Sequence, residues 1–116
     1  MSALTAVAVL REAKTVLETN GWHAGSYYAR AAGGDPAKAP VDLYGAINLA
    51  AGAKAPNLRG GPAVEAAIAL IQHALHKRGL QVGIAEWNDE PGRVVGEALA
   101  LLDEAVAQVE ALDGAR

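Results

Sequence analysis

The sequence predicts a mainly α-helical protein, a compact bundle of about four helices. Apolar residues recur at helical spacing in three long segments, and glycine follows the first and the third of the predicted helices. Although 52% of the residues are hydrophobic, the chain has no Phe, only 2 Trp and 3 Tyr. Its core must therefore consist mainly of Ala, Val, Leu and Ile. At 116 residues the chain can bury one such core, so residues 1–116 are expected to form a single domain.

The first helix is predicted over residues 2–19. Ser2 can accept hydrogen bonds from the free amides of the first turn, and Asn20-Gly21 is typical of a helix end. The apolar residues that share one face of this helix are Leu4, Val7, Leu10, Ala13, Val16 and Leu17.

Residues 21–41 combine aromatic residues with turn residues. Gly33-Gly34-Asp35-Pro36 is typical of a turn, and the residues before it have modest strand character. A small β-hairpin between Ser26 and Val41 is therefore predicted, with a loop as the alternative. The aromatic and imidazole side chains of this segment are Trp22, His23, Tyr27 and Tyr28. They could cover one end of the helical core, or they could line a pocket with polar tips.

Two further helices are predicted in the middle of the chain. Asp42 could cap a short helix that ends before Gly52. A longer helix begins at Pro62, which suits a first turn, and ends at Gly79. Its apolar stripe consists of Val64, Ala67, Ile68, Ile71, Ala74 and Leu75.

The last helix is predicted over residues 94–112, with Asn88 or Asp89 as its N-cap and Pro91 in its first turn. The residues just before it, including Ile84, permit either an extended connector or one helical turn that ends near Trp87. Two adjacent rows of this helix are apolar, so it should pack against two neighbours. One row, which would also suit a partner helix in a dimer, consists of Val95, Leu99, Leu102, Val106 and Val109.

Composition excludes several classes of function. The chain has no Cys, which removes thiol catalysis, disulfides and thiolate metal sites. Its net charge is -3 and its longest basic run is Lys77-Arg78, so no nucleic-acid partner is expected. The apolar segment from Ala3 to Leu10 is too short to span a bilayer, and we expect a cytoplasmic protein without a membrane partner.

No catalytic or metal site can be assigned from the sequence. His73 and His76 are three residues apart on one predicted helix, but no third ligand stands at a recognisable spacing. Gly60-Gly61 precedes a helix without the Gly-Lys-Ser/Thr signature of a phosphate loop. No cofactor is therefore expected.

A binding site remains a candidate, because polar and aromatic residues gather in a few segments that folding could bring together. Glu86 and Asp89 flank Trp87, an arrangement that can serve acid-base chemistry, although capping explains Asp89 equally well. The candidate ligand-binding residues are Trp22, His23, Tyr27, Tyr28, Tyr44, Trp87, Asn88, Asp89 and Arg93.

Three short motifs resemble a family of small uncharacterised bacterial and phage proteins, a domain of unknown function. These motifs are Gly21-Trp22, the segment from Leu43 to Ile47, and the segment from Ile84 to Arg93, which contains Trp87-Asn88-Asp89. Members of that family often carry a cysteine near the position of Asp42-Leu43, where this chain has none, so a thiol role would not carry over. The resemblance supports the fold and implies no established activity.

We therefore expect a non-enzymatic accessory or regulatory protein that acts through protein-protein interaction, with a second copy of itself as one candidate partner. The wide apolar face of the last helix and the lack of a catalytic constellation favour this interpretation. The alternative is a small-molecule-binding protein or minor enzyme that uses the pocket formed by Trp22, His23, Tyr27, Tyr28, Tyr44 and Trp87.

Overall fold

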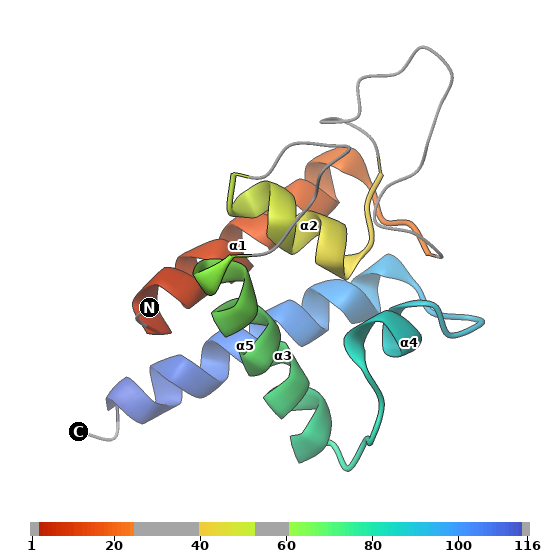
Figure 1. Ribbon diagram of the computed structural model, residues 1–116. Coiled ribbons are helices and arrows are strands. Elements are labelled where there is room, and N and C mark those ends of the chain that lie inside the picture. Colours follow the sequence, from red (N-terminus) through yellow and green to blue (C-terminus); the bar gives the residue numbers. More distant parts are fainter. Residues whose placement is uncertain (1–2, 25–39, 53–60, 115–116) are drawn as a thin grey trace.

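The computed structural model describes residues 3–24, 40–52 and 61–114, and the predicted mainly α-helical fold is confirmed (Figure 1). The described residues form five helices rather than about four, because the segment before Asn88 adopts the helical turn that the sequence left as an alternative. The helices are α1 (Ala3–Asn20), α2 (Leu43–Ala50), α3 (Pro62–Lys77), α4 (Ile84–Asn88) and α5 (Val95–Gly114).

The predicted β-hairpin falls largely on residues 25–39, which lie outside the described residues. Among the residues that the structure describes, extended pairing is limited to one isolated parallel bridge between Trp22 and Val41. In this bridge, the amide of His23 donates to the carbonyl oxygen of Val41 at 2.9 Å. The amide of Val41 donates to the carbonyl oxygen of Gly21 at 3.0 Å. The bridge fixes the residues that follow α1 against those that precede α2.

Helices α1, α3 and α5 contact one another and enclose the core, while α2 packs mainly on α1 (Figure 1). α1 and α5 run antiparallel, since Arg11 pairs with Glu110 and Lys14 with Asp103. The larger side chains that are almost completely buried are mostly aliphatic, as composition predicted: Leu10, Leu17, Val41, Leu43, Ile47, Ile71, Leu75, Ile84, Leu101 and Leu102.

Helix α5 packs against two neighbours, α1 and α3, as its two apolar rows predicted. Leu102, Val106 and Val109, which belong to the row that would have suited a partner helix, are buried inside this chain. Of the large apolar side chains that the structure describes, only Val94 and Val95 are exposed, at 56% and 39%. The apolar row of α5 is therefore largely used within the monomer.

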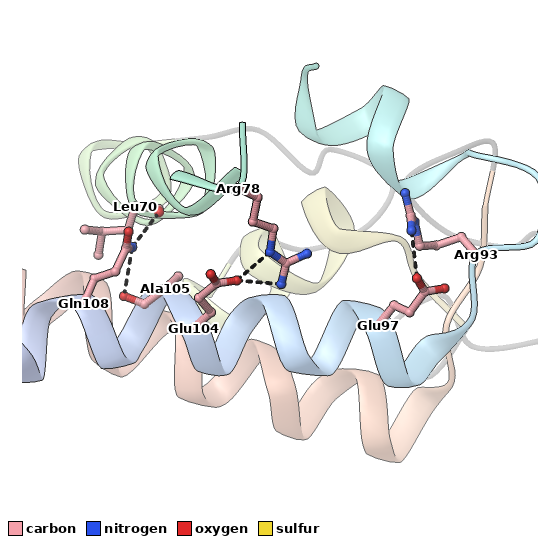
Figure 2. A network of polar contacts seen from close by, with 7 residues as sticks. All are labelled: Leu70, Arg78, Arg93, Glu97, Glu104, Ala105 and Gln108. Atoms are coloured by element: carbon pink, nitrogen blue, oxygen red, sulfur yellow. Dashed lines mark hydrogen bonds and ion pairs between the residues drawn. The ribbon is translucent and has the colours of Figure 1, made fainter. Parts of the chain in front are cut away.

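Polar contacts join the middle of α5 to the second half of α3 and the residue that follows it (Figure 2). The guanidinium of Arg78 donates to the carboxylate of Glu104 at 2.7 Å, and the amide nitrogen of Gln108 donates to the carbonyl oxygen of Leu70 at 3.2 Å. On the α1 side, the Asp103 carboxylate bonds Lys14 and raises the pKa of its amine. Because both ion pairs are at least one-third exposed, each contributes little to stability.

The predicted start of α2 is confirmed. Asp42 is the N-cap, and its carboxylate oxygen Oδ1 accepts a hydrogen bond from the amide of Gly45 at 2.7 Å. Gly52 follows the helix with a φ of +95°, a left-handed conformation that glycine adopts without strain. Gly21 and Gly79, with φ values of +97° and +83°, end α1 and α3 in the same way.

The predicted N-cap of the last helix is wrong. Asn88 is the last residue of α4 and Asp89 is its C-cap, whereas α5 begins only at Val95. The intervening Gly92 has a φ of +87°, so the backbone turns out of the helical conformation after Pro91. The first turn of α5 is closed instead by Glu97, whose carboxylate accepts from the amide of Val94 at 3.1 Å.

Within the described residues, we find no helix with the length and apolar character needed to cross a membrane.

Candidate functional site

The side chain of Asn88 is the centre of the candidate site. It is fully buried at the end of α4 and contacts residues that are far away in the sequence. Its oxygen Oδ1 accepts hydrogen bonds from the indole nitrogen Nε1 of Trp22 at 2.8 Å and from the amide of Leu43 at 3.2 Å. Its nitrogen Nδ2 donates to the carbonyl oxygen of His23 at 3.2 Å and to Oδ1 of Asp89 at 3.0 Å.

These four contacts determine the orientation of the amide group. The indole of Trp22 and the backbone amide of Leu43 can only donate, so the side-chain atom of Asn88 that faces them must be its oxygen. The carbonyl of His23 can only accept, so the nitrogen faces it. Asn88 therefore joins the start of α2, the loop after α1 and the end of α4 with its hydrogen-bonding capacity filled.

Asp42 and Asp89 place two carboxylates around this amide. The side chain of Asp42 is 3% exposed, and burial raises the pKa of its carboxyl group to about 6. The hydrogen bond from Gly45 opposes this shift, and the negative charge of Asp89 adds to it. A carboxyl group with this pKa changes its protonation state close to neutral pH, as a general acid or a pH-sensitive group does.

Replacing Asp42 with Asn is expected to stabilise the protein at pH 7 by about 2 kcal/mol. Asn caps helices as well as Asp does, and it removes the cost of keeping a buried carboxylate charged. In the folded protein the pKa is raised, so the stabilisation that protonation of Asp42 provides is complete below pH 4 and is lost as the pH rises through about 6. Urea unfolding of both proteins between pH 4 and 7.5 should show stability curves that converge in acid. A stability difference that is the same at every pH would contradict this assignment.

Trp87 and Arg93 contact each other between the Asn88 side chain and the start of α5. The ring of Trp87 is 2% exposed, and the guanidinium carbon of Arg93 lies 3.9 Å from the centre of the ring. Nε of Arg93 donates to the carbonyl oxygen of Trp87 at 2.9 Å. Nη1 of Arg93 donates to the carboxylate of Glu97 at 2.9 Å, as Figure 2 shows. Hydrogen bonds from the Val94 amide and from Arg93 lower the pKa of the Glu97 carboxyl group. Arg93 thus fixes the residues between α4 and α5 against Trp87.

Replacing Arg93 with Met should lower the free energy of unfolding by about 1–2 kcal/mol, because Met retains the aliphatic stem but loses the hydrogen bond to Trp87 and the cation-π contact. Thermal unfolding would measure this loss. Replacing Arg78 with Met is the matched control, because its ion pair with Glu104 is about one-third exposed and should contribute less than about 1 kcal/mol. Equal losses in the two variants would show that the contact with Trp87 adds nothing.

The structure brings most of the predicted site residues together. Hydrogen bonds connect Trp22, His23, Leu43, Asn88 and Asp89 in one group, here called the Asn88 group. A cation-π contact joins Arg93 to Trp87, the residue before Asn88. Tyr44 follows Leu43 in the first turn of α2, where its carbonyl oxygen accepts from Asn48 at 2.8 Å. Tyr27 and Tyr28 lie outside the described residues.

Sequence reasoning missed two participants, the buried carboxyl group of Asp42 and the amide of Leu43. Local sequence indicates Asp42 only as a helix cap, and the burial of its carboxyl group depends on tertiary packing. Its short distance in sequence from Tyr44 was the one available signal. His73 and His76 are exposed on α3. Across residues 3–24, 40–52 and 61–114, no three His, Cys, Asp or Glu side chains gather in a way that could hold a metal ion.

Comparison with known proteins identifies the family. The model of DUF6197, a family of unknown function, matches residues 1–108. The chain belongs to this family. Because the DUF6197 match includes every residue of the Asn88 group, the group lies within the part of the chain that defines the family. Neither a curated protein nor a solved structure shows significant similarity to this DUF6197 member.

Proposed function

We propose that this protein is a non-enzymatic accessory or regulatory module that binds another protein through the residues between α4 and α5. We define the α4–α5 surface as residues 89–95. The observation that carries the proposal is the exposure of Val94 and Val95, the only large apolar side chains exposed among the described residues. The Asn88 group, by contrast, already uses its hydrogen-bonding atoms within the chain.

The α4–α5 surface is fixed in place before any partner binds. Arg93 holds it to Trp87, and its amide donates to the carbonyl oxygen of Glu90 at 3.0 Å. The amide of Val94 donates to Glu97 at the other end. A surface that is already ordered loses little conformational entropy on binding, which favours recognition by a protein.

Charge favours a basic partner. Asp89 and Glu90 belong to the α4–α5 surface and Glu86 precedes it on α4, and all three residues are exposed. Arg93, the cation of this segment, is only 15% exposed and pairs with Glu97 at 2.9 Å and, more distantly, with Glu90 at 3.8 Å. Such a surface favours a segment that carries Lys or Arg together with an apolar side chain, because complementary charges steer association and select partners.

A different protein is favoured over a second copy of this chain. The apolar row that suggested a homodimer is largely buried between α5 and its neighbours α1 and α3. We extend the proposal to a cytoplasmic protein of bacteria or phages, on the resemblance carried by Gly21-Trp22, the segment from Leu43 to Ile47 and the segment from Ile84 to Arg93.

The test is cross-linking in an extract of the native host with the wild-type protein and a Val94→Ser, Val95→Ser double variant. A specific partner should cross-link to the wild type and be lost with the variant, while both proteins unfold at similar temperatures. Ala107→Ser on the exposed side of α5 is the matched control and should keep the partner. A partner that cross-links equally to all three proteins would place the interaction elsewhere.

The second candidate function is small-molecule binding. It is favoured by the convergence of Trp22, Asn88 and Asp89 with a carboxyl group, that of Asp42, whose pKa is close to neutral. Tryptophan fluorescence of the protein during a screen of metabolite classes would test it, because Trp22 and Trp87 both lie at the site. A ligand whose affinity is unchanged by Trp22→Phe would not use this site.

A further inference from the structure

The Asn88 group lies directly before the α4–α5 surface and is its attachment to the rest of the fold. Asn88 ends α4, and Asp89 is the first residue of the surface. Through Oδ1, Asn88 bonds the amide that starts α2, and through Nδ2 it bonds the loop after α1 and Asp89 itself. A change in this group can therefore alter how firmly the surface is held.

Two carboxylates on different elements meet at this attachment. Asp42 precedes α2 and is buried, and Asp89 follows α4 and accepts from Asn88. The other titratable residue here is His23, in the loop after α1, whose carbonyl oxygen bonds Asn88. The nearby cation, Arg93, is bonded to Trp87 and to Glu97. We propose that Asp42, Asn88 and Asp89 form a proton-responsive junction, in which protonation of Asp42 in mild acid tightens the attachment of α4 to α2 and so holds the α4–α5 surface more firmly.

The direction of the response follows from the contacts of Asp42. When its carboxyl group is charged, it is buried and repelled by Asp89, so the junction is under electrostatic strain. When it is protonated, one oxygen can still accept from the amide of Gly45 and the repulsion disappears. Folding raises the pKa of Asp42 from 3.8 to about 6. Lowering the pH from 7.5 to 5 should therefore favour the state in which α4 is attached to α2 over the detached state by about tenfold.

The experiment uses nuclear magnetic resonance of the full chain without any partner. The indole proton of Trp22, which bonds Asn88, should shift with a midpoint near pH 6. Hydrogen exchange at the amides of Trp87 and Asp89, corrected for its intrinsic pH dependence, should be about tenfold slower at pH 5 than at pH 7.5. In Asp42→Asn the indole shift should not titrate and exchange should be slow at both pH values, because Asn preserves the helix cap.

His23→Gln is the control for the imidazole side chain in the loop after α1. The proposal requires the Trp22 transition to persist in His23→Gln and to vanish in Asp42→Asn. It also requires Asp89→Asn to lower the midpoint, since the charge of Asp89 raises the pKa of Asp42. A transition that vanishes only in His23→Gln, or a Trp22 resonance that is constant between pH 5 and 7.5, would overturn it. Only the link to partner binding rests on the proposed function, so a failed cross-linking experiment would leave the junction intact.

Discussion

Replacing Asn88 with Ala should lower the free energy of unfolding by about 3–5 kcal/mol. The change removes four hydrogen bonds and leaves the buried amide of Leu43 without its partner. An unsatisfied buried donor costs about 1–3 kcal/mol, and the small cavity adds to this loss. The indole of Trp22 is only partly buried, so it can bond water instead. Since small domains are stable by about 5–15 kcal/mol, this loss is a large part of the total stability.

Asn48 is the matched control for this prediction. It is as buried as Asn88, at 2% exposure, but its side chain makes one hydrogen bond, to the carbonyl oxygen of Tyr44, and its Oδ1 has no partner. Asn48→Ala should therefore cost less than about 1 kcal/mol. Chemical unfolding of the three proteins would measure both values. If the two variants lose equal stability, burial of an amide rather than the Asn88 contacts explains the loss.

Replacing Leu102 with Ala should cost about 2–5 kcal/mol, because Leu102 is 1% exposed in the core that α5 shares with its neighbours. Val95→Ala, at a position that is 39% exposed, should change stability by less than about 0.5 kcal/mol. Thermal unfolding would show the difference between these two positions of the same apolar row.

The same pair of variants separates a core position from a dimer interface. If Leu102 contacted a second copy of the chain, the midpoint of unfolding would rise with protein concentration and Leu102→Ala would remove that dependence. We expect a midpoint that is independent of concentration in the wild type. A concentration dependence that is lost in Leu102→Ala would contradict the assignment of this row to the core.

The helices were predictable because their signals are local. The stripe from Val64 to Leu75, the cap at Asp42 and the glycine stops at Gly21, Gly52 and Gly79 each depend on neighbouring residues. The last helix shows the limit of this reasoning. Asn88 and Asp89 are good caps in isolation, but Asn88 forms three of its four hydrogen bonds with residues that are distant in sequence, and Gly92 interrupts the helix.

The sequence predicted which residues belong to the candidate site better than it predicted the contacts among them. Trp22, His23, Asn88 and Asp89 stood out because polar and aromatic residues are rare in this aliphatic chain. That their polar atoms mostly satisfy one another could not be predicted, because it depends on how α2 and α4 meet. For the same reason, the rise in the pKa of Asp42, which burial causes, could not be predicted from local patterns.

The contacts of Asn88 also bear on the order in which the chain folds. Asn88 bonds residues that are 66, 65 and 45 positions away, so its network forms only after α1, α2 and α4 have come together. Closing such long loops is slow, and local helices can form well before it. Asn88→Ala should therefore speed unfolding while leaving the folding rate nearly unchanged. The lifetime of the native state, more than its rate of formation, depends on this one amide.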